Sequence, residues 1–427
     1  MTNEFTSLIE LRRDLHAHPE TGWTEFYTTA RLAEEFKQLG YKLAFGTKVI
    51  PEEKRLGVPD DSELDQARER AKREGAAGYF LHQMRQTTGM VAEKQYGNGP
   101  VIGLRVDIDA LNISESSDTA HFPSSAGFAS KHPGLMHACG PDGHAAIGVG
   151  VARTIDRLDA FDGTLRIFCQ PAEEGCRGGL AMSQSSYLQG VDALFSLHIG
   201  MGHGTGKVVA GFERPLANAK LNVKFTGEET HAGRSPEDGR NALQAATTAI
   251  QNLYAISRHA SGTTRINIGR VRSPNPVNVV ASETRMRVGV RASTEAALQY
   301  MLDRAEDILD NSARMHDVAV DWDMYGRATT FKADEPAINA VVDAAESHNQ
   351  ISDVVNRAKF GASEDASYLI RRVQELGGVA TYLGIGAARP AGHHTAHFDF
   401  DEDAIGIGVD VVADSIRRIA RCEDLCQ

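Results

Sequence analysis

Length, composition and charge define a globular chain of more than one domain and exclude several functions. The chain has 427 residues, 41% hydrophobic and 24% charged, with a formal net charge of −12. One hydrophobic core rarely grows past about 250–300 residues, so we expect two domains. The acidic balance argues against binding of nucleic acid, and no apolar run reaches the ~18 residues of a membrane span.

The N-terminal segment and the cysteines indicate a reducing compartment. The start of the chain has no basic leader followed by an apolar stretch, and the five cysteines are mostly widely spaced. A disulfide framework is therefore not expected, and we predict a cytoplasmic protein.

The first elements in chain order are helices and a polar insertion. Apolar residues at helical spacing predict one helical region over 7–40, ending at Gly40. Residues 51–96 are rich in charge and poor in apolar side chains. This composition predicts a solvated helical insertion, and a partner surface is the alternative.

Buried strands and helices then alternate. The apolar runs are VIGLRV at 101–106, TLRIFCQ at 164–170 and ALFSLHIG at 193–200, with helical patterns such as HAAIGVGVARTIDRL between them. This alternation predicts an α/β fold with a mostly parallel sheet and flanking helices. Ligands bind beyond the carboxyl ends of strands in such sheets, so Asp107, Glu173, Glu174 and His198, near strand ends, should cluster.

The pattern changes near residue 213. About four alternating strands and two helices over 213–326 predict a small α+β sandwich, and helix–strand alternation returns from 327 on. His394 lies in this last part. We therefore predict a discontinuous catalytic domain, 1–212 and 327–427, with a lid or dimerisation domain inserted at 213–326.

Four short segments carry chemistry-bearing side chains. QPAEEG at 170–175 places two glutamates after a strand, where one could bind a metal and the other act as a base. MHACGPDGH at 136–144 offers thiolate and imidazole ligands, although it could simply be a turn before a helix that begins near Pro141. His198 could be a core residue, and AGHHTAHFDFDED at 391–403 a surface loop. Together they form the set that a two-metal hydrolase needs.

Six motifs in the same order resemble the aminoacylase/carboxypeptidase family of metallopeptidases, in its amidohydrolase branch. Beyond RRDLHAHPETGW near the start they are LRVDIDAL, MHACGPDGH, FCQPAEEG, SLHIG, HAGRSPEDGRNAL and GHHTAHFDFDED. The resemblance implies a metal-dependent amidohydrolase with two divalent cations, Mn or Zn. It also implies a homodimer, or a heterodimer with a homologous B subunit.

The resemblance implies a role for each matching residue. Cys139 would bridge both metals, with Glu174 and His394 at one and His198 at the other. Glu173 would be the general base, and Asp107 would orient a ligand. His231, from the inserted domain of a neighbouring subunit, would stabilise the oxyanion, and Asn278 and Arg291 would hold the substrate carboxylate.

One departure from the family pattern concerns a metal ligand. The family has C-G-H-D-x-H, whereas this chain has Pro141 in place of the first histidine. Proline has no donor atom, so the metal site of His198 is expected to be weakened. Asp142, His137 or His144 could replace the lost ligand, although we expect His144 to lie on the helix and point away.

The expected reaction is hydrolysis of an amide between an aromatic acyl group and an amino acid, as in p-aminobenzoyl-glutamate. An indole-3-acetyl-aspartate-type conjugate is the alternative substrate. Because of Pro141, a metal-impaired binding protein or a subunit that depends on a partner is the alternative function.

Overall fold

The computed structural model describes residues 2–157 and 161–422 and divides into two compact units. The first unit comprises the described residues up to Glu213, Phe331–Phe360, and those from Asp365 on. The second comprises Arg214–Thr330 and Gly361–Glu364. No helix in the described part of the chain is both long and apolar enough to cross a membrane.

The first unit is built on an eight-stranded sheet in the order β1-β2-β4-β3-β5-β14-β6-β12. Its strands are β1 (Lys42–Phe45), β2 (Met90–Gln95), β3 (Val101–Asp107), β4 (Thr164–Gln170), β5 (Ala193–Ile199), β6 (Lys207–Val209), β12 (Asp353–Val355) and β14 (Val379–Ile385). β4, β3, β5 and β14 are parallel neighbours. The predicted α/β fold with a mostly parallel sheet is confirmed.

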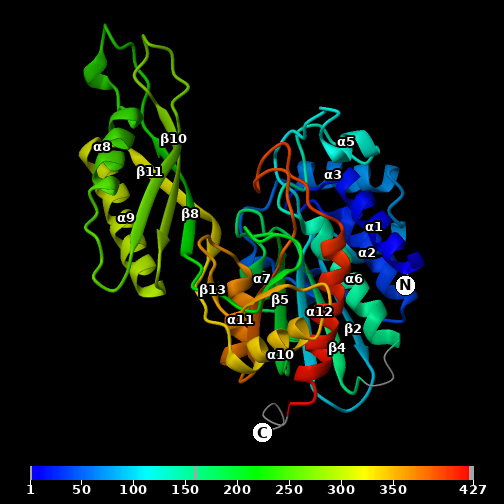
Figure 1. Cartoon of the computed structure of the whole chain (residues 1–427). Coiled ribbons are helices and arrows are strands. Elements are labelled where there is room, and N and C mark those ends of the chain that lie inside the picture. Colours follow the sequence, from blue (N-terminus) through cyan, green and yellow to red (C-terminus); the bar gives the residue numbers. More distant parts are fainter. Residues whose placement is uncertain (1, 158–160, 423–427) are drawn as a thin grey trace. The chain divides into compact units, whose positions relative to one another are not determined.

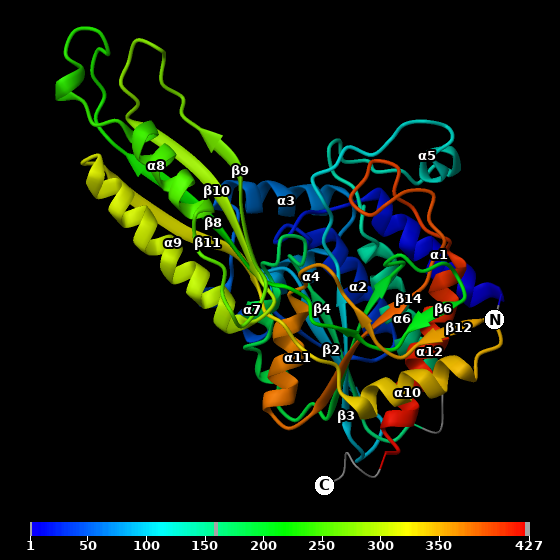
Figure 2. The ribbon, with the colours of Figure 1, turned by 60° about the vertical axis from the view of Figure 1, so that its left-hand side comes forward.

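Helices cover both faces of this sheet (Figure 1, Figure 2). One face packs against α1 (Thr2–Ala17), α2 (Phe26–Gln38), α6 (Pro141–Arg157), α10 (Glu335–Glu346) and α12 (Asp403–Ile419). The other packs against α7 (Gly179–Met182) and α11 (Ala366–Glu375). Successive strand residues alternate between the two cores, as Leu194 and Phe195 do, because side chains alternate across a strand.

Two predictions for the N-terminal part were wrong in detail. The helical region expected over 7–40 is two helices, α1 and α2, interrupted around Pro19 and Gly22. Residues 51–96 contain α3 (Asp61–Arg73) and α4 (Gly78–Met84), as a helical insertion should, but they end in β2. β2 joins the sheet because Met90, Val91 and Ala92 are fully buried.

The second unit is a four-stranded antiparallel sheet with two helices. Its order is β11-β8-β10-β9, from β8 (Ala217–Thr226), β9 (Thr264–Arg272), β10 (Glu283–Ala292) and β11 (Ala319–Ala328). α8 (Ala242–Tyr254) and α9 (Glu295–Met315) cover one face. These elements match the predicted α+β sandwich. The short elements α5 (Phe122–Ala126), β7 (Phe212–Glu213) and β13 (Ala358–Lys359) complete the chain.

Candidate metal centre

The sheet order brings the predicted site residues of the first unit together. β4, β3, β5 and β14 run side by side in one direction, so their carboxyl ends lie at one edge. Glu173 and Glu174 follow β4, Asp107 ends β3, and His198 lies at the end of β5. His394 lies in the loop after β14, and Cys139 precedes α6.

Cys139, Glu174 and His394 form one group whose ligand atoms all lie within 4.8 Å of one another. The Nε2 atom of His394 is 3.3 Å from the sulfur of Cys139 and 3.7 Å from a carboxylate oxygen of Glu174. These residues come from three segments, and Cys139 and His394 are 255 positions apart. The structure thus brings together three of the four predicted metal ligands.

Cys139, His198 and His393 form a second group, again within 4.8 Å. The sulfur of Cys139 is 3.4 Å from Nε2 of His198, and Nδ1–H of His198 donates to the carbonyl of Ile199 at 2.8 Å. This bond fixes the tautomer in which the Nε2 lone pair faces Cys139. His393 was not predicted, and the only signal for it in the sequence is its place beside His394.

The electrostatics of the two groups favour a bound cation. Burial, followed by Glu174 and Glu173, raises the pKa of the Cys139 thiol well above its usual value. Burial also lowers the pKa of His198 well below its usual value, so its imidazole is neutral and able to bind a metal. A divalent cation would stabilise the thiolate that this environment otherwise disfavours. The residues present therefore fit a pair of cations bound through S, N and O ligands.

Asp109, which the sequence analysis did not single out, positions the two glutamates. Its carboxylate accepts the backbone N–H of Glu173 at 2.8 Å and that of Glu174 at 3.0 Å. Glu25 accepts the N–H of Ala172 at 2.8 Å, where the backbone turns with φ of 56°. Buried carboxylates from other segments thus hold the turn after β4. The second aspartate of VDIDAL was the available signal.

Asp107 contacts a histidine that lies against the second group. His144 Nδ1–H donates to Asp107 at 2.7 Å, and the N–H of Ile199 donates to His144 Nε2 at 3.0 Å. The ring of His144 is 4.6 Å from that of His198. His144 does lie on α6, as predicted, but it does not point away. It packs beside His198 because both of its nitrogens are held there.

The second unit carries the other three predicted residues. His231 forms an isolated bridge with Val279, and the N–H of Ala232 donates to the carbonyl of Asn278 at 3.0 Å. His231 and Asn278 are therefore neighbours on exposed loops. Arg291 lies on β10 with its side chain on the exposed face of the sheet. It lines a hollow of about 640 Å³ together with Arg258 and Arg265.

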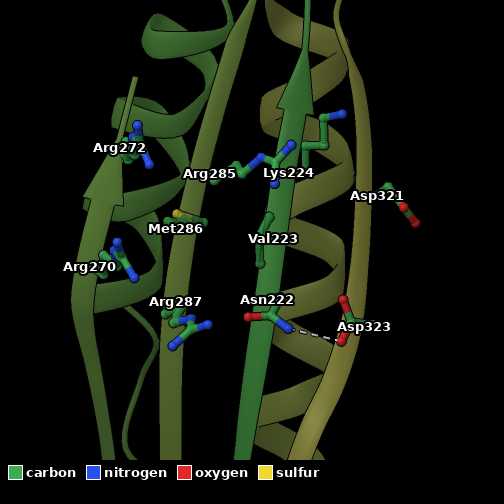
Figure 3. Close-up of a pocket in the computed structure, with 10 residues that line it drawn as sticks. All are labelled: Asn222, Val223, Lys224, Arg270, Arg272, Arg285, Met286, Arg287, Asp321 and Asp323. Carbon is green, nitrogen blue, oxygen red and sulfur yellow. Dashed lines mark hydrogen bonds between the residues drawn. The ribbon is translucent and has the colours of Figure 1, made fainter. Parts of the chain in front are cut away.

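The exposed face of this sheet is strongly basic. A hollow of about 450 Å³ on this face is lined by Lys224, Arg270, Arg272, Arg285 and Arg287, with Asp321 and Asp323 on β11. Figure 3 shows how these side chains lie along the strands. Two arginine pairs are in direct cross-strand register, Arg285 with Arg272 and Arg287 with Arg270. Like charges directly opposite destabilise a sheet. Among the described residues, no carboxylate lies within ion-pair distance of Arg270 or Arg272, so this face attracts anions.

A paired set of thiolate, imidazole and carboxylate ligands next to a second glutamate defines a metal-dependent hydrolase. The sequence profile of the peptidase family M20/M25/M40 matches residues 103–418, and the chain belongs to this family. The family includes a dinuclear metal-binding peptidase of Bacillus subtilis, which shares the fold at 23% identity, with a TM-score of 0.66 and 98% of each chain covered.

Three relatives are similar over nearly their whole length. The chain is 39% identical to the A subunit of p-aminobenzoyl-glutamate hydrolase from Escherichia coli K12, covering 95% of this chain and 94% of that protein. It is 38% identical to indole-3-acetyl-aspartic acid hydrolase of Enterobacter agglomerans, with the same coverage. The crystal structure of aminobenzoyl-glutamate utilization protein from Klebsiella pneumoniae aligns with a TM-score of 0.82, at 34% identity, over 96% and 95% of the two chains.

Proposed function

We propose that the chain hydrolyses the amide bond of an N-acyl amino acid in which an aromatic acyl group is joined to glutamate or aspartate. The observation that carries this proposal is the arrangement of two ligand groups around Cys139, next to Glu173. The names of two relatives support the substrate class, because one hydrolyses p-aminobenzoyl-glutamate and the other indole-3-acetyl-aspartic acid.

In this proposal, separate residues of the chain bind the metals and transfer the proton. Cys139, Glu174 and His394 would hold one cation, and Cys139 and His198 would hold the other. When bound, two divalent cations, Zn or Mn, supply Lewis acidity to the scissile carbonyl and to water. Glu173 takes a proton from the attacking water and passes it to the leaving amine. Asp107 acts on His198 through His144.

The second unit contributes to the substrate side of the proposal. His231, from the second unit of a neighbouring subunit, stabilises the oxyanion, and Asn278 and Arg291 hold the carboxylate of the amino acid. The basic face of the sheet supports an acidic amino acid, because a field of one sign raises the local concentration of oppositely charged substrate. The proposal also includes a cytoplasmic dimer, formed either with a second copy or with a homologous B subunit, since the Escherichia coli relative is named as the A subunit of a hydrolase.

The test is turnover of p-aminobenzoyl-glutamate by the purified chain with Mn²⁺ or Zn²⁺, measured as released p-aminobenzoate. Glu173→Gln should reduce kcat by about 10²–10⁴-fold and leave the metal content unchanged. Glu53→Gln, at an exposed glutamate, is the matched control and should retain full activity. Full activity of Glu173→Gln would contradict the mechanism. Indole-3-acetyl-aspartate, assayed in parallel, decides between the two acyl groups.

Pro141 favours one alternative, a metal-impaired binding protein or a subunit that needs a partner. In that case the wild-type chain would bind acyl-glutamate conjugates without turnover at any metal concentration. Addition of a homologous second subunit would then separate a partner-dependent enzyme from a binding protein.

A further inference from the structure

The family pattern has a histidine where this chain has Pro141, so the cation beside His198 lacks one of its expected ligands. Pro141 is buried at the first position of α6, where proline is well suited because its missing N–H has no partner inside the helix. It offers no donor atom to a cation. Cys139 and His198 would then be the only side chains left of the ligands that the family pattern provides there.

Two of the three neighbours of Pro141 that could supply a ligand are held by other partners. Asp142 lies 2.9 Å from both Arg12 and His16. His144 has both ring nitrogens in hydrogen bonds, to Asp107 and to the backbone of Ile199. His137 has both ring nitrogens buried without a hydrogen-bond partner, but among the described residues it lies in neither ligand group. None of the three candidates from the sequence is therefore grouped with Cys139 and His198.

His393 lies beside Cys139 and His198, where none of the three candidates from the sequence supplies a ligand. One of its ring nitrogens lies within 4.8 Å of the ligand atoms of Cys139 and His198, and its ring is 5.2 Å from that of His198 at an angle of 78°. The ring of Phe398 also packs against this imidazole, with ring centroids 4.8 Å apart. The ring is thus positioned by aromatic packing beside the second group.

The weak hydrogen bonding of the His393 imidazole leaves it available to bind a cation. Its Nδ1 atom has no partner at hydrogen-bond geometry in the described residues, its Nε2 accepts a long contact of 3.3 Å from the N–H of Met201, and the ring also interacts with the backbone of Cys139. Buried polar atoms are normally satisfied, so a half-buried imidazole held this weakly beside Cys139 and His198 favours a role as a ligand. His144, by comparison, is held at 2.7 and 3.0 Å.

We propose that His393 replaces the ligand lost at Pro141, so that Cys139, His198 and His393 hold the second cation. This inference rests on the proposed function, in which Cys139, Glu174 and His394 hold the first. Adjacent histidines then serve different cations. This is possible because the backbone at His394 has φ of 61° and its N–H donates to the carbonyl of Ala138 at 2.8 Å. The chain retains two metal sites despite Pro141.

The test is titration of the metal-free full-length chain with Co²⁺, followed by thiolate-to-cobalt absorption and by bound metal per chain. The wild type should bind two equivalents. His393→Gln should bind one equivalent tightly and the other at least ~10–100-fold more weakly, since even loss of a supporting residue has that effect. Pro141→His in the His393→Gln background should restore the second equivalent. His397→Gln changes a histidine of the same loop that lies in neither group, and it should bind two.

Each other outcome has a distinct meaning. Two equivalents at unchanged affinity in His393→Gln, or only one in the wild type, would overturn the role of His393 and leave the proposed function standing. No bound cobalt in the wild type would overturn both. Should His393→Gln not fold, anomalous diffraction from wild-type crystals grown with Co²⁺ gives the answer. The inference requires a His393 nitrogen about 2.0–2.2 Å from a second ion, and a second ion without that contact refutes it.

Discussion

Arg12 connects the N-terminal helix to two segments that carry candidate metal ligands. Its guanidinium is fully buried and lies 2.9 Å from Asp142, 2.6 Å from Asp399 and 3.2 Å from Glu402. Asp142 is the second residue of α6, and Asp399 follows the histidine-rich loop. Arg12→Met preserves much of the apolar volume but removes the cation that these carboxylates share.

We expect this substitution to destabilise the first unit strongly. Removing one partner of a buried ion pair costs about 3–5 kcal/mol. For a unit of about 300 residues, this corresponds to a melting temperature about 5–8 °C lower. The matched control is Arg13→Met, because Arg13 contacts the same Glu402 at 2.6 Å but its side chain is 34% exposed. Exposed ion pairs contribute about 0–1 kcal/mol.

The pH dependence gives a second check on this reasoning. Burial would raise the pKa of Asp142, but Arg12 and His16 outweigh it and hold the pKa below its usual value. The stability from such a group is present above the unfolded-state pKa of about 4 and is lost as the pH falls through the folded-state pKa. Differential scanning calorimetry should therefore show the largest deficit near pH 7 and a smaller one below about pH 4. A deficit at pH 7 no larger than that of Arg13→Met would refute the argument.

Two other predictions concern the turn after β4 and the basic face. Asp109→Asn places an N–H against one of the backbone donors of Glu173 and Glu174, so it should cost about 1–3 kcal/mol of stability and lower kcat about 10–100-fold. Asp118→Asn, in an exposed loop, is the control, and equal activity of the two variants would contradict the positioning role. Arg270→Ser/Arg272→Ser should lower kcat/KM for an acyl-glutamate about 3–10-fold at ~0.01 M salt but not at ~1 M, because salt screens exposed charges. Arg304→Ser/Arg314→Ser on α9 changes the net charge equally, and an identical salt dependence in both variants would exclude a local effect of the basic face.

Local patterns predicted the elements wherever apolar periodicity was strong. The strands at 101–107, 164–170 and 193–199 and the start of α6 at Pro141 follow from runs of apolar residues and from proline at a helix N-terminus. The break between α1 and α2 was missed because the apolar residues within each helix recur at helical spacing, whereas the interruption is marked only by Pro19 and Gly22. β2 was missed because only its first three residues are apolar, and the charged residues of α3 dominate the composition around it.

The residues that were missed at the site depend on contacts between distant segments. Asp109 acts by accepting backbone N–H groups after another strand, and no side-chain spacing encodes that. His393 and His394 are adjacent, and sequence spacing alone cannot say that each faces a different partner. That distinction arises from the left-handed backbone at His394, which a non-glycine residue adopts at a cost of about 1–2 kcal/mol.

The sheet order explains how such a site survives a large insertion. Between His198 and His394 the chain forms the whole second unit, yet β14 returns to pair with β5 in parallel register from Val379 to Ile385. The entropy of closing a flexible loop grows only logarithmically with its length, and each doubling costs about 0.6 kcal/mol. The seven-residue pairing of β14 with β5 therefore sets where the loop after β14 begins, and the ion pair of Arg12 with Asp399 fixes its far end. Because the position of the histidine pair depends on these two anchors, the inserted unit can change in length and sequence without displacing it.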